Sequence, residues 1–270
     1  MPPNQTGSVG IMPPDMQVIS SPSNPFFKQC KLWLEKSKKR KQDSVVLVEG
    51  MHEIECALRG KCEPLHWIQP NDMGVEAQDL ASRFLSQYEL SASLFSQLVL
   101  RKSGQVALAV LKQPQALAFE LSKNGRYLVV ESVEKPGNLG AILRSVDASG
   151  IEGVIICDPK VDVFNPQVIR NSVGSVFSVP VWVVSAEEAY AQIEANHLRL
   201  YSTFMEQSES FWTADLGPGS AVVIGTEHEG VSDFWKDKGQ NIQIPMQGSV
   251  DSLNVSVAAA LLVFEMARRS

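Results

Sequence analysis

Three stretches in the second half of the chain combine glycines or small polar residues with side chains that could do chemistry. The stretches and their groups are Glu134–Gly140 with Asn138 and, just beyond it, Arg144; Gly225–Gly230 with Glu227; and Gln247–Asn254 with Ser252 and Asn254. Glycine lets a backbone approach a ligand closely, and hydroxyl, amide and guanidinium groups supply hydrogen bonds. Loops of this composition suit the binding of a polar ligand.

Each stretch taken alone has a simpler explanation. Asn138 and Gly140 could be turn residues before a helix, Arg144 could be a solvated helix residue, and Gly225 and Gly230 could be ordinary turn glycines. However, each stretch follows a predicted strand, and ligands bind beyond the carboxyl ends of parallel strands. Three such loops at one edge of a sheet therefore predict a single site.

The elements that must position these loops alternate along the chain. Predicted strands are Tyr127–Glu131, Gly153–Cys157, Val179–Val184, Leu198–Thr203, Ala221–Thr226 and Ile242–Ile244, and predicted helices are Leu139–Ala148, Pro166–Val173, Ala186–Asn196 and Val255–Arg268. Asn165 before Pro166 and the capping box Ser185–Glu188 mark two helix starts. The alternation predicts an α/β fold with a mainly parallel sheet that is covered on both faces.

The first half predicts a smaller α/β unit. Asn24-Pro25 starts a helix that we expect to run through a basic cluster. The elements predicted after it are a strand at Ser44–Val48, a helix at Gly50–Leu58 closed by Gly60, a strand at Leu65–Gln69, a helix at Glu76–Ser86 and a strand at Val106–Leu111. The expected boundaries are a disordered tail at 1–16, a small α/β domain at 17–112, a linker at 113–125 and a larger domain at 126–270.

Composition narrows the functional classes. The 270 residues carry a net charge of −6 and 44% hydrophobic residues, as in an ordinary globular protein. No run is long enough to span a bilayer, and the N-terminus lacks the features of a secretory signal. Seven basic residues and one acid between Lys28 and Lys41 form either a solvated helix or a phosphate-binding patch.

Several known motifs are absent from the sequence. Gly137 and Gly140 do not form a dinucleotide-binding fingerprint, and neither a phosphate-binding P-loop nor a nucleophile elbow occurs. The four cysteines form no C-x-x-C pair, and His52-Glu53 lacks the second histidine of a metalloprotease motif. We therefore expect reduced thiols, a cytoplasmic protein and no metal site.

The three stretches closely resemble the ordered motifs of the SpoU/TrmH family. The matching segments are Asn138–Arg144, Ile224–Gly230 and Ile244–Ala258. The first half is also similar to the family's RNA-recognising domain, which resembles a ribosomal protein, at Ser23–Pro25, the basic cluster and Leu47–Gly50.

Members of this family are RNA ribose 2′-O-methyltransferases of the SPOUT class. The resemblance implies a C-terminal trefoil knot, S-adenosylmethionine as cofactor, and a homodimer with the active site at its interface. The final helix, which has almost no polar face, agrees with a dimer but also with burial inside one chain.

The resemblance also implies a role for each matching residue. The catalytic set is Arg144, Asn138, Glu227, Ser252 and Asn254; the cofactor-binding set is Thr203, Gly225, Ile244, Met246 and Leu253; and the RNA-binding set is Lys28, Lys36, Lys38, Lys39, Arg40 and Lys41. Because arginine stays protonated, we expect Arg144 to hold the RNA phosphate and ribose hydroxyl rather than to abstract a proton. The proton would leave through the phosphate or water.

Other functions remain open at this point. The protein could be an RNA-binding assembly factor without catalysis, although the complete catalytic set argues against this. It could methylate a base, although the first-loop arginine and the Ser252–Asn254 stretch favour ribose. We expect ribosomal RNA rather than transfer RNA, because relatives with such an N-terminal domain often act on the ribosome.

Overall fold

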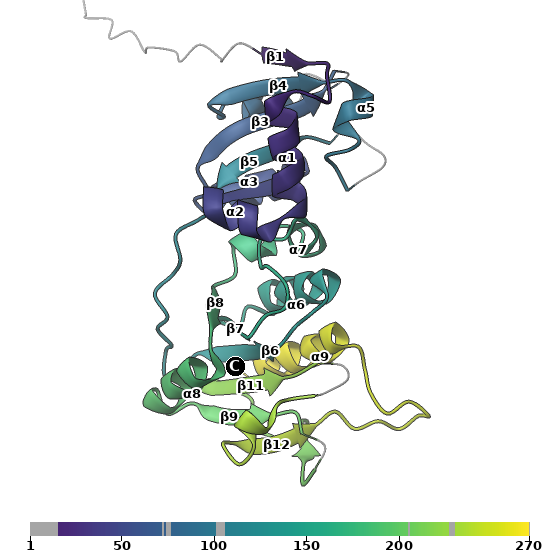
Figure 1. The fold of residues 1–270 in the computed structure, drawn as a ribbon. Coiled ribbons are helices and arrows are strands. Elements are labelled where there is room, and N and C mark those ends of the chain that lie inside the picture. The colour runs from purple at the N-terminus through teal and green to yellow at the C-terminus, as the bar shows by residue number, and fades with distance from the viewer. Residues whose placement is uncertain are drawn as a thin grey trace, which may run out of the picture.

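The computed structural model describes residues 16–71, 73, 77–100, 106–204, 206–226 and 230–269. In these residues Figure 1 shows two stacked units, each built on its own sheet. The N-terminal elements are β1 (Met16–Ile19), α1 (Pro25–Glu35), α2 (Ser37–Asp43), β2 (Val45–Glu49), α3 (Met51–Arg59), β3 (Pro64–Pro70), α4 (Gln78–Ala81), β4 (Ser86–Leu90), α5 (Ala92–Phe95) and β5 (Leu108–Lys112). Strand β1 starts at Met16, the last residue of the predicted tail; the rest of that tail lies outside the described residues.

The N-terminal sheet is mixed, with the described strand order β1-β4-β3-β5-β2. Strand β4 pairs in parallel with β1 and β3, whereas β5 is antiparallel to β2 and β3. Asn24 caps α1 through its side-chain oxygen, which accepts hydrogen bonds from the backbone N–H groups of Phe26 and Phe27, as the sequence predicted. Gly60 closes α3, again as predicted.

Two predictions for this half were wrong. The helix that begins at Pro25 does not continue through the basic cluster, because Lys36 is extended (φ −114°, ψ 106°) and separates α1 from α2. The helix expected over 76–86 is limited, among the described residues, to Gln78–Ala81, and the unpredicted strand β4 starts at Ser86. Strand β1 was also missed, since a four-residue edge strand leaves little pattern in the sequence.

The second unit begins at Arg126, the first residue of β6, after a segment that follows β5. Its elements are β6 (Arg126–Glu131), α6 (Pro136–Ser149), β7 (Gly153–Cys157), α7 (Pro166–Asn171), the 3₁₀ turn η2 (Ser175–Phe177), β8 (Val181–Val184), α8 (Ala186–Ala195), β9 (Arg199–Ser202), β10 (Glu209–Ser210), β11 (Ser220–Ile224), the 3₁₀ turn η3 (Asp233–Trp235), β12 (Gln240–Gln243) and α9 (Val255–Arg268). The predicted N-cap at Asn165 and the capping box at Ser185 are both present.

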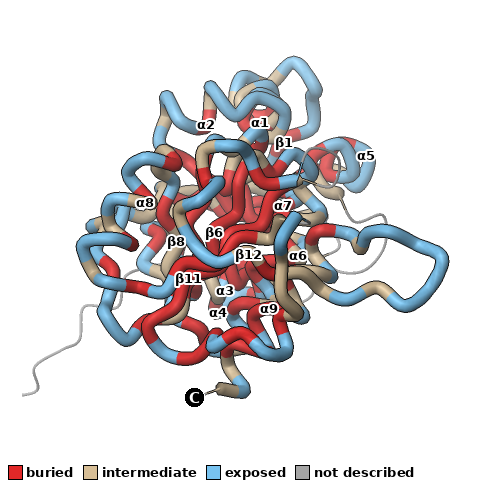
Figure 2. The backbone as a smooth tube through the Cα atoms, turned by 90° about the horizontal axis from the view of Figure 1, so that it is seen from below, coloured by how far each residue is buried: buried red, intermediate tan, exposed pale blue. Residues whose placement is uncertain are grey.

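The second sheet has the described order β10-β12-β9-β11-β6-β7-β8, and its neighbouring strands pair in parallel throughout the part of the chain that the structure describes. This confirms the predicted α/β fold with a parallel sheet. Alternate residues of β6 face opposite layers: Leu128 packs with the α6 and α9 side, whereas Val129 packs with the α8 side. Figure 2 shows that the buried stretches concentrate on these central strands.

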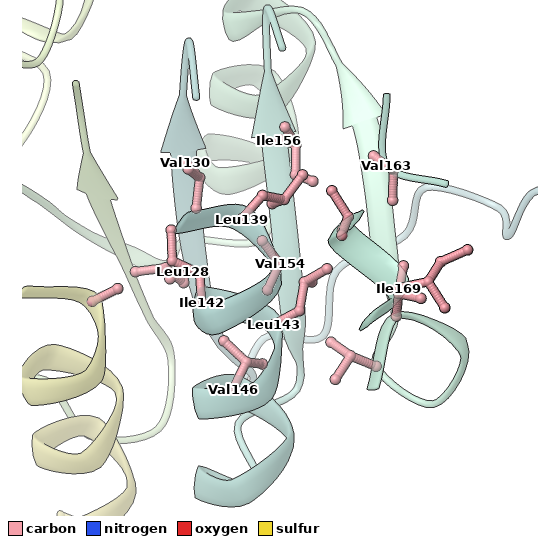
Figure 3. Close-up of a cluster of buried hydrophobic side chains, with 14 of the residues drawn as sticks. Leu128, Val130, Leu139, Ile142, Leu143, Val146, Val154, Ile156, Val163 and Ile169 are labelled. Atoms are coloured by element: carbon pink, nitrogen blue, oxygen red, sulfur yellow. The ribbon is translucent and has the colours of Figure 1, made fainter. Parts of the chain in front are cut away.

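Helix α6 is fixed on the sheet by one apolar face. Leu139, Ile142, Leu143 and Val146 are fully buried and recur at helical spacing. Figure 3 shows them between the side chains of β6 and β7, with Ile169 of α7 alongside. Burying each such side chain contributes about 1.5–3 kcal/mol. The opposite face of α6, which carries Arg144, remains exposed.

Candidate active site

The loops after β9, β11 and β12 enclose a pocket of about 460 Å³ at the carboxyl edge of the second sheet. This is the edge where the sequence predicted a site, and the volume lies in the range of pockets that hold small molecules and cofactors. The residues that line it are Thr203, Phe204, Ile224, Gly225, Thr226, Gly230, Ile242, Gln243, Ile244, Met246, Asp251, Ser252, Leu253, Val255 and Ala258.

All of the residues predicted to contact a cofactor line this one pocket. They come from three separate loops and are Thr203, Gly225, Ile244, Met246 and Leu253. Thr203 is held at the end of β9, where its hydroxyl donates to the carbonyl of Val223 at 3.1 Å. Most of the described lining side chains are apolar, and Asp251 is the one charged residue among them. The pocket therefore suits a ligand with an apolar body and scattered polar atoms.

The second loop brings Thr226 and Gly230 together in a short antiparallel bridge. The backbone N–H of Thr226 donates to the carbonyl of Gly230 at 3.0 Å, and the N–H of Gly230 donates to the carbonyl of Thr226 at 3.2 Å. A Cβ atom at Gly225 would collide with the carbonyl of Gly230, so this position requires glycine. The predicted catalytic Glu227 lies outside the described residues.

A buried carboxylate that the sequence did not single out anchors the chain just after this loop. Glu131, at the end of β6, accepts hydrogen bonds from the N–H of Ser232 at 2.8 Å, the hydroxyl of Ser232 at 2.7 Å and the indole N–H of Trp235 at 2.9 Å. Its position at a strand end was the available signal, but a lone acid at the end of an apolar strand does not reveal its partners.

The third loop ends in a contact that joins the first and third stretches. Asn254 caps α9 by accepting a hydrogen bond from the N–H of Ser256 at 3.0 Å, and its side-chain nitrogen donates to Asn138 Oδ1 on α6 at 3.3 Å. The residues on either side of Asn254, Leu253 and Val255, line the pocket. In Figure 1 part of the segment between β12 and α9 projects away from the body of the protein.

The predicted catalytic residues thus occupy different places. Ser252 lines the pocket, and Asn138 and Asn254 meet at its rim. Arg144 is not among the lining residues; it is exposed on the outer face of α6. Asp251 and Phe204 line the pocket but were not predicted, although both lie within or beside the same loops.

Four of the six predicted RNA-binding side chains are exposed, one is half-buried and one is buried. Lys28, Lys36, Lys38 and Lys41 are exposed. Lys39 is half-buried and pairs with Asp43 at 3.1 Å; the hydrogen bond from the Trp33 indole and the contact with Lys39 lower the pKa of Asp43. These lysines lie on α1, on α2 and at the bend between them.

The buried one is Arg40, whose side chain is 1% exposed and pairs with Asp162 of the second unit at 2.6 Å. Its predicted place on the RNA-binding surface is therefore corrected. Sequence spacing alone could not show this, because the face that α2 buries depends on the bend at Lys36 and on contact with the other unit.

Comparison with known proteins defines the family. Residues 125–264 match the SpoU rRNA methylase family, and residues 24–109 match the MRM3-like substrate-binding domain. The chain belongs to the SpoU rRNA methylase family.

Within the described residues no group of three or more histidine, cysteine or acidic side chains is arranged to hold a metal ion. No helix in the described ranges has the length and apolar character needed to cross a bilayer.

Full-length relatives of this family member include proteins of stated activity. The chain is 29% identical over 252 residues to the 23S rRNA (guanosine(2553)-2'-O)-methyltransferase RlmP of Bacillus subtilis, covering 93% of this chain and 99% of the relative. It is similar to a solved RNA 2′-O ribose methyltransferase, with 37% identity, a TM-score of 0.83 and coverage of 94% and 99%. The SpoU methyltransferase AviRb from Streptomyces viridochromogenes, solved in complex with AdoMet, matches with 25% identity, a TM-score of 0.82 and coverage of 91% and 98%.

Proposed function

We propose that this family member transfers a methyl group from S-adenosylmethionine to a ribose 2′-oxygen in RNA, with ribosomal RNA as the substrate class. The observation that carries the proposal is the convergence of Thr203, Gly225, Ile244, Met246 and Leu253 on one pocket whose rim holds Asn138 and Asn254. The full-length similarity to RlmP supports ribosomal RNA.

The pocket fits S-adenosylmethionine. Its volume of about 460 Å³ and its mixed wall of backbone and apolar groups suit an adenosine with a short polar extension. When bound, the cofactor supplies a sulfonium-linked methyl group, which passes to the ribose oxygen as the carbon–sulfur bond breaks. The chain's part is to orient the ribose, and we assign this role to Ser252, which lines the pocket, and to the Asn138–Asn254 pair beside it.

Arg144 acts, in this proposal, on the RNA rather than on the cofactor. Its guanidinium holds the phosphate and ribose hydroxyl in line with the methyl group, because its planar donors match phosphate oxygens. The hydroxyl proton leaves to the phosphate or to water, since an arginine cannot accept it. Glu227, which belongs to the second loop, is assigned the orientation of this charged site.

We also infer that the active enzyme is a homodimer. Val257, Leu261 and Phe264 recur at helical spacing on α9 and are 48%, 39% and 52% exposed. Helix α9 packs against α6, whose outer face carries Arg144. A second copy covering this face would bury the apolar stripe and bring Arg144 next to a pocket. The trefoil knot implied by the resemblance stays a prediction.

The experiment is methyl transfer from labelled S-adenosylmethionine to ribosomal and transfer RNA by the purified full chain, followed by nucleoside analysis. We expect a 2′-O-methylated nucleoside from ribosomal RNA. A methylated base, or a product from transfer RNA alone, would contradict the substrate assignment. Failure to bind the cofactor in calorimetry would favour an RNA-binding assembly factor.

The cell supplies a complementary test. Mapping of 2′-O-methylated positions in RNA from cells with and without the gene should show one or a few riboses that lose the modification. An unchanged methylation map in all stable RNAs would overturn the proposed activity in that cell.

The four cysteines are free thiols, and we propose that the protein works in the reducing cytoplasm.

A further inference from the structure

A buried ion pair links the two units. Arg40 of α2 donates to Asp162 Oδ2 through Nη2 at 2.6 Å and through Nε at 3.2 Å. The side chains are 1% and 7% exposed. Asp162 lies in the segment between β7 and α7, so the pair joins the basic region of the N-terminal domain to the methyltransferase domain.

The same arginine also fixes the bend that orients the basic helices. Its Nη1 donates to the carbonyl of Trp33 at 2.7 Å and to that of Leu34 at 3.3 Å, at the end of α1. Carbonyls in the last turn of a helix have no partner within that helix, so the guanidinium satisfies them. One side chain therefore sets both the angle between α1 and α2 and their attachment to the second domain.

On the other side, Asp162 is tied to the start of α7. Its Oδ1 accepts from the N–H of Phe164 at 3.2 Å, and its carbonyl accepts from the N–H of Asn165, the residue that caps α7. Helix α7 packs against both β2 and α6. A Cβ atom at Gly140 of α6 would lie 2.6 Å from Asn171 Cβ of α7, so the two helices are in close contact.

The rest of the boundary is tightly packed as well. A Cβ atom at Gly60, at the end of α3, would lie 2.6 Å from the carbonyl oxygen of Phe177. A Cβ atom at Gly174 would lie 2.7 Å from Cys56 Cβ. Buried side chains of both domains belong to one apolar cluster, which includes Val46 and Ile169. The domains thus meet in a defined orientation, and Figure 1 shows α7 and α6 between the N-terminal domain and α9.

Stability alone does not explain a buried ion pair at this boundary. Desolvation of two charges cancels much of their attraction, and apolar residues of similar volume often stabilise a protein equally well. The pair instead fixes the geometry of the boundary. Because the guanidinium is planar and bonds to two carbonyls of α1 and to the Asp162 carboxylate, it can make all of these bonds only when α1 and Asp162 are held in one relative orientation.

We propose that the Arg40–Asp162 pair is an interdomain latch that selects which ribose is methylated. The inference rests on the proposed function, because it assumes that RNA is held by the N-terminal lysines and methylated at the pocket. Arg40 and Asp162 are positioning residues that touch neither substrate nor cofactor. By fixing α2 relative to α7 and α6, they determine which nucleotide of the bound RNA reaches Asn138 and Arg144.

The test substitutes Asp162→Asn in the full chain. Asparagine keeps the oxygen that accepts from Phe164 but presents an amide N–H₂ to Arg40 in place of a carboxylate oxygen. We expect the single-turnover rate at the native ribose to fall about 10- to 100-fold, since misplacement by about 1 Å has such effects. Methylation should spread to neighbouring riboses, while the Kd values for S-adenosylmethionine and RNA change less than about twofold.

A second variant perturbs the boundary without a change of charge. Gly60 has φ −75° and ψ 15°, which alanine adopts readily, so Gly60→Ala adds only a methyl group against Phe177 and forces the domains to shift. It should reproduce the loss of positional selectivity. The matched control is Glu63→Gln, which removes an exposed pair with Lys112 (3.3 Å) inside the N-terminal domain and should leave rate and selectivity unchanged.

The outcomes separate the latch from the function on which it rests. Equal loss of rate at every ribose, in proportion to the unfolded fraction, would show a merely structural role and overturn the latch. Unchanged rate and selectivity in both boundary variants would overturn it too. If wild type transfers no methyl group, the proposed function fails. Amide hydrogen exchange still tests the latch in that case, because both variants should speed exchange where α2 meets the segment before α7, and unchanged exchange there contradicts it.

Discussion

Two surfaces of this protein use arginine in opposite ways. At the boundary between the domains, Arg40 is buried, and its guanidinium nitrogens bond to Asp162, Trp33 and Leu34. On the outer face of α6, Arg144 is exposed beside a helix that presents Val257, Leu261 and Phe264 to the outside. At the first surface, groups of the same chain bury the arginine and accept its hydrogen bonds. The second surface has the composition of one that another molecule covers.

The difference indicates where function depends on partners. Burial of a charge is tolerated only when its hydrogen bonds are satisfied, as they are around Arg40. An exposed apolar stripe such as that of α9 is unfavourable in water and is typical of a surface that a second protomer or RNA covers. We therefore expect changes at the boundary to alter geometry, and changes on the α6–α9 face to abolish chemistry or assembly.

The largest expected effect is at Arg144. Arg144→Ala should lower turnover about 100-fold, because the group that holds the RNA phosphate and the ribose hydroxyl in line with the methyl group is removed. Affinity for S-adenosylmethionine should be unchanged, since Arg144 does not line the pocket. Single-turnover kinetics and calorimetry measure the two quantities. Wild-type turnover in this variant would remove Arg144 from the catalytic set and weaken the contrast with Arg40.

The next effect concerns neighbouring leucines of α9. Leu261 is 39% exposed on the apolar stripe, whereas Leu262 is fully buried. Leu261→Glu should yield a folded monomer with little activity, as measured by light scattering and methyl transfer. Leu262→Ala should instead lower the free energy of unfolding by about 2–5 kcal/mol. A Leu261→Glu variant that remains dimeric would show that this stripe is not the interface.

A smaller effect is expected from the lysines that remain on the basic surface. Lys38→Gln with Lys41→Gln should weaken RNA binding and make the slope of log affinity against log salt shallower by about 0.7–0.9 for each RNA phosphate that is no longer neutralised. Asp162→Asn should leave that slope unchanged, since Arg40 does not face the RNA. Titrations at several salt concentrations decide this. An identical slope in the lysine variant and wild type would make the cluster a solvated helix.

The smallest effect is on the buried side of α9. Bonds from Arg268 at 2.7 Å and Arg269 at 2.7 Å lower the pKa of Glu265 from its ordinary value of 4.5. Glu265→Gln should cost about 1 kcal/mol or less at neutral pH, because Arg268 is largely exposed and screened by water.

The sign of the pH dependence follows from the lowered pKa. The carboxylate contributes stability above its unfolded pKa, and this contribution is lost as pH falls through the lower pKa of the folded state. The difference between wild type and Glu265→Gln should therefore shrink below pH 4.5, as measured by urea unfolding. A difference that does not depend on pH would assign the effect of the substitution to packing.

The second domain could be predicted in detail because its signals are local. Buried parallel strands such as Gly153–Cys157 are continuous apolar runs, and α9 begins after Asn254, which satisfies its first N–H groups. The loops after these strands had to meet at one edge of the sheet, so most of the pocket followed from the order of elements. In the first domain, short strands such as Ser86–Leu90 depend on their neighbours and gave no comparable pattern.

The sequence by itself determined the family, the parallel sheet and the loops that enclose most of the pocket, since these depend on periodicity, caps and motifs along the chain. Only the tertiary structure decided which charges face solvent. Arg40 and Lys41 are adjacent in the sequence, yet one is buried against Asp162 and the other is exposed. The bend at Lys36 and the contact with the second domain select the buried face of α2, and neither is encoded by the basic run alone.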